Sequence, residues 1–187
     1  TGAKRRVTCI FAAGEDAMRW LRFLMPVISI AILTLAATLP WGLPTADRFV
    51  LPLLPVVAIY HWTRDQDAWL PEWMIFLAGL TLDVLTQGPL GYWALVYLFA
   101  YVVAIFASRV TVEGFVGRLA LLAGAVVVVT VFAWLAASFY FLEMLDPEPY
   151  ARGAIFAVLS ALLITPVLGV FGTLSKSVRT VRLTRGG

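Results

Sequence analysis

Long apolar runs separated by short connections dominate this sequence and leave few folds open to it. The runs cover residues 23–39, 49–62, 71–86, 90–108, 117–142 and 150–174, and the longer ones reach the roughly 20 residues that a membrane-spanning helix requires. Hydrophobic residues make up 61% of the chain and charged residues only 13%, so this composition cannot supply a water-soluble surface. The sequence predicts an all-α polytopic membrane protein with six transmembrane helices.

The second run is short and contains Pro52 and Pro55. As a helix it would extend only about 21 Å at about 1.5 Å per residue, less than the roughly 30 Å of a hydrocarbon core. It therefore crosses a thinned or protein-lined region, or it is re-entrant. The distribution of Lys and Arg favours a full span, because six spans with both termini inside leave only Arg48 and Arg152 outside. We therefore expect both termini on the cytoplasmic side of the membrane.

The domain organisation follows from these runs. Residues 18–175 form the predicted six-helix domain, and residues 176–187 form a basic cytoplasmic tail. Residues 1–17 are interpreted as a mobile basic tail, and Met18 is a candidate native start. We expect no nucleic-acid partner, because the chain has no compact basic domain.

The sequence offers no recognisable catalytic or metal-binding pattern. Cys9 is the only cysteine and His61 the only histidine, which excludes an internal disulfide and a His/Cys cluster of metal-ligand type. A catalytic triad, a Walker-type loop or a pair of carboxylates within one run is not found either. Nothing in the sequence argues for an enzyme, and we expect no cofactor.

Asp83 is the residue that most needs an explanation, because it interrupts the apolar stretch GLTLDVLTQGPLG, residues 79–91. A carboxylate in hydrocarbon is costly and must be protonated, hydrated or paired. Asp83 lies near the C-terminal end of its predicted helix, where the macrodipole disfavours an anion, so we do not expect it to act as a helix cap. Candidate charged partners are Arg48 and Arg152, with Thr86, Gln87 and the Tyr and Trp side chains of the next run as hydrogen-bonding neighbours.

Three roles remain open for Asp83. It can tie the turn at Gly88, Pro89 and Gly91 to its surroundings, contact a partner protein, or belong to a proton or ion path. The remaining acids fall at the ends of runs, whereas an ion path usually contains several intramembrane ionisable groups. The structural role is therefore the simplest interpretation.

Two helix faces also invite explanation. Trp93, Tyr97 and Tyr101 are spaced at i, i+4 and i+8 in the fourth run, which places them on one face for packing and interfacial anchoring. A strip of small residues at four-residue spacing marks the sixth run and would let another helix approach closely. Its members are Gly153, Ala157, Ala161, Thr165 and Gly169. The approaching helix can be internal, which we favour, or can belong to a partner.

The third and fourth runs carry a motif that resembles the MreD family of bacterial rod-shape determination proteins. In that family a third span ending in Gly-Leu-x-x-Asp precedes a Pro-Leu-Gly turn and an aromatic-rich fourth span. The matching residues here are Gly79, Leu80, Asp83, Pro89, Leu90, Gly91, Tyr97 and Tyr101. The short second run, which ends in an aromatic pair before a polar loop, is also similar to that family.

The resemblance implies a non-enzymatic scaffold in the bacterial inner membrane that belongs to the cell-elongation machinery, which makes peptidoglycan. Such a scaffold would bind the single-span protein MreC, the glycosyltransferase RodA with its penicillin-binding transpeptidase, and indirectly the MreB filament. The family's fold resembles the substrate-binding subunits of energy-coupling-factor transporters, so a small-ligand-binding transporter subunit is the alternative function. Under the scaffold hypothesis, Asp83, Gly88, Pro89, Gly91, Tyr97, Arg48 and Arg152 surround an outer pocket or docking surface.

Overall fold

The computed structural model describes residues 24–39, 51–64, 70–112 and 114–163. The predicted tails, Arg48, and the Thr165 and Gly169 positions of the small-residue strip lie outside these ranges. All regular secondary structure within them is helical, which confirms the predicted all-α class.

The helices follow the apolar runs closely. They comprise Leu24–Thr38, the 3-10 turn η2 (Leu51–Leu53), α2 (Leu54–Arg64), α3 (Glu72–Thr86), α4 (Tyr92–Ser108), α5 (Phe115–Phe141) and a helix over residues 148–163. Pro71 immediately precedes α3, where a residue without an N–H group costs no hydrogen bond, and Glu72 places a negative charge in the first turn.

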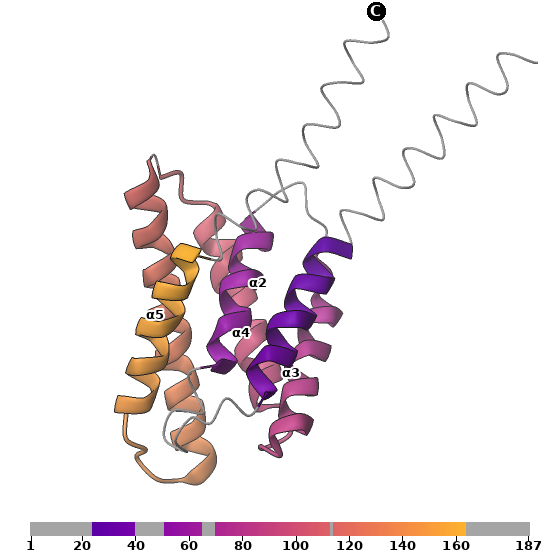
Figure 1. The fold of residues 1–187 in the computed structure, drawn as a ribbon. Coiled ribbons are helices and arrows are strands. Elements are labelled where there is room, and N and C mark those ends of the chain that lie inside the picture. The colour runs from indigo at the N-terminus through magenta and orange to yellow at the C-terminus, as the bar shows by residue number, and fades with distance from the viewer. Residues whose placement is uncertain (1–23, 40–50, 65–69, 113, 164–187) are drawn as a thin grey trace, which may run out of the picture.

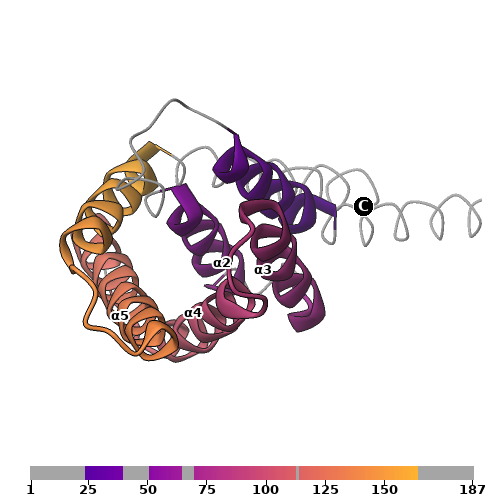
Figure 2. The same ribbon diagram turned by 90° about the horizontal axis from the view of Figure 1, so that it is seen from below.

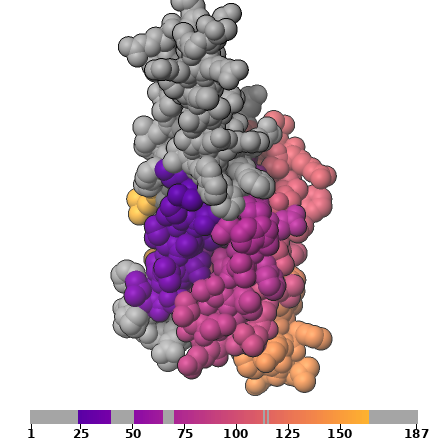
Figure 3. All heavy atoms as spheres, turned by 90° about the vertical axis from the view of Figure 1, so that its right-hand side faces the viewer, coloured from indigo at the N-terminus to yellow at the C-terminus, as the bar shows by residue number. Residues whose placement is uncertain are grey.

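Successive helices run up and down between the two ends of one bundle (Figure 1). The α3–α4 turn and the connection after α5 lie at the lower end in that view, and the α4–α5 connection lies at the upper end. Seen along the bundle, α2 lies inside a ring made by the other helices (Figure 2). The helix Leu24–Thr38 lies beside α3 on one face of the molecule (Figure 3).

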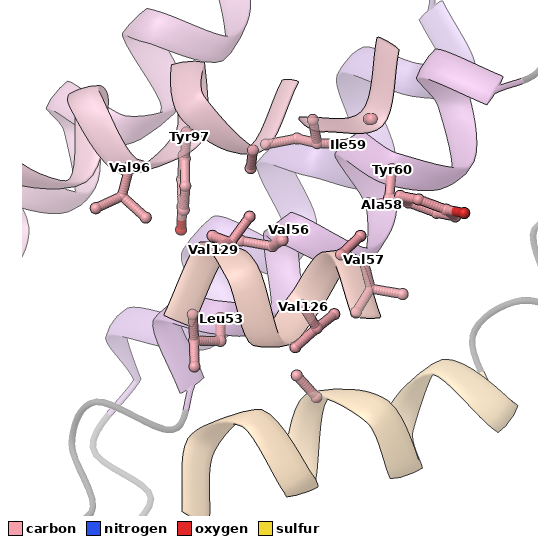
Figure 4. Packing of buried hydrophobic residues seen from close by; sticks show 14 of the residues in the cluster. Leu53, Val56, Val57, Ala58, Ile59, Tyr60, Val96, Tyr97, Val126 and Val129 are labelled. Atoms are coloured by element: carbon pink, nitrogen blue, oxygen red, sulfur yellow. The ribbon is translucent and has the colours of Figure 1, made fainter. Parts of the chain in front are cut away.

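The burial of α2 explains how so short a helix can exist in an apolar protein. Seven of its residues are buried, on all sides of the helix: Pro55, Val56, Val57, Ala58, Ile59, Tyr60 and Trp62. In Figure 4, Tyr97 from α4 and Val126 and Val129 from α5 lie around the α2 side chains Val56 and Val57. A helix that is apolar all round belongs in a core. The second run is therefore lined by protein in the described structure.

Polar side chains join the helices at a few points in this core. The Trp62 indole N–H of α2 donates to the Ser29 hydroxyl oxygen at 2.7 Å. The Tyr92 hydroxyl of α4 donates to the Ala133 carbonyl oxygen of α5 at 2.9 Å. Such bonds fix the rotation of one helix against the next, because apolar contacts alone have no preferred direction.

The small-residue strip faces the interior wherever it is described. Gly153, Ala157 and Ala161 are buried in the helix over residues 148–163. Internal packing, the favoured role for the strip, is therefore confirmed for these three positions.

The outer surface of the bundle is strongly apolar. Large hydrophobic side chains are exposed on every helix of the ring, among them Ile32, Phe76, Phe106, Leu135 and Leu163. Among the described residues, one helix segment, Val116–Phe141, is both long and apolar enough to cross a membrane by itself. The helices Leu24–Thr38 and Tyr92–Ser108 are apolar but shorter.

A matched pair of isoleucines tests the central position of α2. Ile59 is 0% exposed and Ile32 is 58% exposed. Ile59→Ala is expected to lower the free energy of unfolding by about 2–5 kcal/mol, because it leaves a cavity among rigid neighbours. Ile32→Ala should stay within about 0.5 kcal/mol of the wild type. Thermal unfolding in detergent measures both, and equal effects would contradict a central α2.

Candidate functional site

Asp83 lies in the last turn of α3, fully buried, with its carboxylate directed at the first turn of α4. The backbone N–H of Gly91 donates to Oδ2 at 2.9 Å, and the N–H of Trp93 donates to Oδ1 at 2.9 Å. A longer contact of 3.5 Å joins the Ala94 N–H to Oδ2. Both carboxylate oxygens are therefore occupied by amides at the start of one helix.

These amides belong to the group that a helix cannot satisfy by itself. The first four N–H groups of an α-helix lack an intrahelical partner, and the same end carries the positive pole of the helix dipole. The N-cap residue of α4 is Gly91, which has no side chain to accept a hydrogen bond from these amides. Asp83 therefore caps α4 from the neighbouring helix, eight to eleven residues back along the chain.

The expectation that Asp83 does not act as a helix cap was wrong. The dipole of its own helix does disfavour an anion, but the N-terminus of α4 is close enough to reverse the local field. The expected side-chain neighbours are engaged elsewhere: the Thr86 hydroxyl donates to the Leu82 carbonyl at 2.7 Å, and Arg152 pairs with Glu148. The interpretation of Asp83 as a tie for the turn that ends at Gly91 is confirmed.

Gly79 lies one helical turn before Asp83 on the same face of α3, and it is what lets α4 come so near. A Cβ atom at position 79 would lie 2.4 Å from the Ala94 Cα and 2.7 Å from the Trp93 carbonyl oxygen. The two backbones are thus in direct contact at the point where Asp83 reaches across. Gly79 was not among the predicted site residues. The signal was present as a Gly and an Asp at i, i+4, a spacing that places both on one face.

The turn between the two helices has two residues with positive φ. Gln87 follows α3 at φ 53°, its N–H bonds to the Val84 carbonyl, and the Gly88 N–H bonds to the Asp83 carbonyl at 3.1 Å. This pair of bonds is the Schellman pattern that commonly ends helices. Gly91 has φ +92°, where a side chain would be strained. Gly88 has an ordinary φ, so the backbone does not require glycine there.

Tyr97 continues the same face of α4 into the core. Its side chain is fully buried, and its hydroxyl donates to the Pro52 carbonyl oxygen at 2.8 Å. The Trp93 ring lies one turn away, with the two centroids 6.1 Å apart. Tyr101 is half-buried one turn further on. The packing role expected for this aromatic face is confirmed.

The arrangement is structural in its chemistry. The Asp83 carboxylate has no exposed surface, and each of its oxygens already accepts a backbone N–H group, so a solute has no direct access to it. In the part of the chain that the structure describes, no group of three or more His, Cys, Asp or Glu side chains is placed to hold a metal ion. What the site provides is a rigid α3–α4 hairpin.

Comparison with known proteins identifies no relative. Neither a protein family, nor a curated protein, nor a solved structure matches this chain.

Removing the carboxylate tests the cap. Asp83→Ala leaves the Gly91 and Trp93 amides without acceptors and should lower the free energy of unfolding by about 1–3 kcal/mol per lost buried partner. Glu143→Gln, at an exposed acid on the next connection at the same end, is the control and should change little. Equal melting temperatures for wild type and Asp83→Ala in detergent would show that the cap does not support the fold.

A pair of glycines tests the close approach of α3 and α4. Gly79→Ala places a methyl group inside van der Waals contact with Ala94, so the helices must separate, at a cost of about 1–3 kcal/mol. Gly124→Ala meets open space on α5 and should be neutral or stabilising, since alanine is favoured over glycine by about 1 kcal/mol in helices. Thermal unfolding measures both variants. A larger loss of stability for Gly124→Ala than for Gly79→Ala would contradict the observed contact.

Proposed function

We propose that this protein is a polytopic membrane scaffold of the bacterial cell-elongation machinery, of the type that the MreD resemblance implies. Its partners would be an MreC-like single-span protein, RodA with its penicillin-binding transpeptidase, and indirectly MreB. One observation supports the proposal above all. Three residues of the resemblance, Gly79, Asp83 and Gly91, lie together in the capped α3–α4 hairpin.

The apolar outer surface supports the membrane part of this proposal. Exposed large hydrophobic side chains encircle the bundle, and only 33% of an apolar 18-residue stretch of α5 is buried. A core helix of a soluble protein would be mostly buried, whereas a lipid-facing helix leaves its outer face apolar and uncovered. We propose six spans, with the short α2 enclosed by the others rather than facing lipid.

The charges support one orientation. Of the described basic residues, Arg64, Arg109 and Arg118 lie at one end of the bundle and Arg152 at the other, beside Glu148. Because cytoplasmic loops carry the excess of Lys and Arg, we place the arginine-rich end in the cytoplasm and the α3–α4 turn on the outer side. Both termini would then be cytoplasmic in an inner membrane.

The site geometry favours a shape-setting role for Asp83 over direct ligand contact. Both of its oxygens are held by backbone amides, so a partner would meet the hairpin that Asp83 fixes rather than the carboxylate itself. The same fact weakens the alternative of a transporter subunit that binds a small ligand through Asp83.

Copurification with an MreC-like protein tests the scaffold function. Wild type is expected to retain the partner in detergent, and Asp83→Ala is expected to lose it together with thermal stability, because the hairpin loosens. Glu143→Gln serves as the control that keeps both. A wild-type protein that binds no such partner but binds a vitamin tightly would overturn the scaffold proposal. A reporter fused after Lys176 should report a cytoplasmic C-terminus, and a periplasmic signal would refute six spans.

A further inference from the structure

The outer helices of the bundle differ greatly in apolar length. α3 has 15 residues and extends about 22 Å, whereas the part of α5 that follows Arg118, Leu119–Phe141, has 23 residues and extends about 35 Å. A typical hydrocarbon core of about 30 Å lies between these lengths. Exposed polar residues mark both ends of α3, Glu72 in its first turn and Gln87 directly after it.

Both helices present mainly apolar side chains to the outside. On α3 these are Trp73, Phe76, Leu77, Val84 and Leu85, and on α5 they include Val127, Val128, Val131, Leu135 and Phe139. Every helix of the ring has exposed apolar side chains, and the exposed charged residues that the structure describes lie at or near helix ends and in the connections. A surface that is apolar on all sides fits a continuous solvent better than one protein partner, so we take lipid acyl chains as its occupant.

Tilting cannot reconcile the two lengths. A long helix can fit a thinner bilayer by tilting, but α3 and α5 run along the same bundle (Figure 1). A tilt that brings α5 into a core of about 30 Å shortens the reach of α3 further. The bilayer must therefore adapt differently on the two sides.

We propose that this protein holds the bilayer thinner along α3 than along α5, and that the α3 face selects phospholipids with short acyl chains. The inference rests on the proposed function only for the membrane location of the bundle. It concerns the lipid contact of two helices and is independent of any protein partner.

Two matched positions report on the two faces. Leu77 on α3 is 47% exposed and Val128 on α5 is 48% exposed, and each lies near the middle of its helix. In a full-length Cys9→Ala background, Leu77→Cys and Val128→Cys are labelled with bimane. Each is then reconstituted into vesicles that mix phosphatidylcholines with monounsaturated chains of about 14 and about 22 carbons. One of the two lipids is brominated at mid-chain, so fluorescence quenching reports which lipid touches the label.

At position 77 the short-chain brominated lipid should quench more strongly than the long-chain one, by a relative preference of at least about twofold. At position 128 we expect no preference, or a preference for the long-chain lipid. The same preference at both positions, or none at either, would overturn the inference. Quenching at position 128 without quenching at 77 would overturn it too, because another protein surface would then cover α3. Absence of quenching at both positions would instead refute the membrane location itself, and loss of the MreC-like partner would affect only the scaffold proposal.

Discussion

The α3–α4 hairpin depends on one interaction, the acceptance of two helix-start amides by a carboxylate from the helix before. An α-helix that begins inside an apolar protein has N–H groups that neither water nor its own turn can satisfy, and each costs several kcal/mol if it stays unpaired in hydrocarbon. Asp83 supplies two acceptor oxygens for the amides of Gly91 and Trp93. The carboxylate in turn gains hydrogen-bond donors, which a carboxylate buried in an apolar protein requires.

That interaction constrains the rest of the bundle through distance. The carboxylate reaches α4 only because Gly79 removes the side chain that would hold the two backbones apart. With α4 fixed against α3, the Tyr97 hydroxyl is positioned to hold Pro52 at the entry to α2, and the Tyr92 hydroxyl to hold α5. Three helices are thereby oriented around the enclosed α2 by contacts that begin at one hairpin.

The helices could be predicted well from the sequence, because the length of an apolar run and the Pro and Gly residues that end it are local features. Pro71 and the Gln87-Gly88-Pro89 segment bound α3 in the structure as they do in the sequence. Sequence reasoning also gave Gly153, Ala157 and Ala161 an inward face from their spacing alone. It failed at the chemistry of Asp83, because the field at that carboxylate is set by the neighbouring helix. The close approach that Gly79 permits is visible only once α4 is placed.

The geometry also explains why the residue is an aspartate. An asparagine has the same reach, but one of its two terminal atoms is a donor and would face an amide N–H instead of accepting from it. A glutamate has two acceptor oxygens but an extra methylene, which would have to fit where Gly79 allows direct backbone contact. Only a short carboxylate satisfies both amides at this separation. The cost of a carboxylate in an apolar core is thus offset by the α4 terminus that it completes.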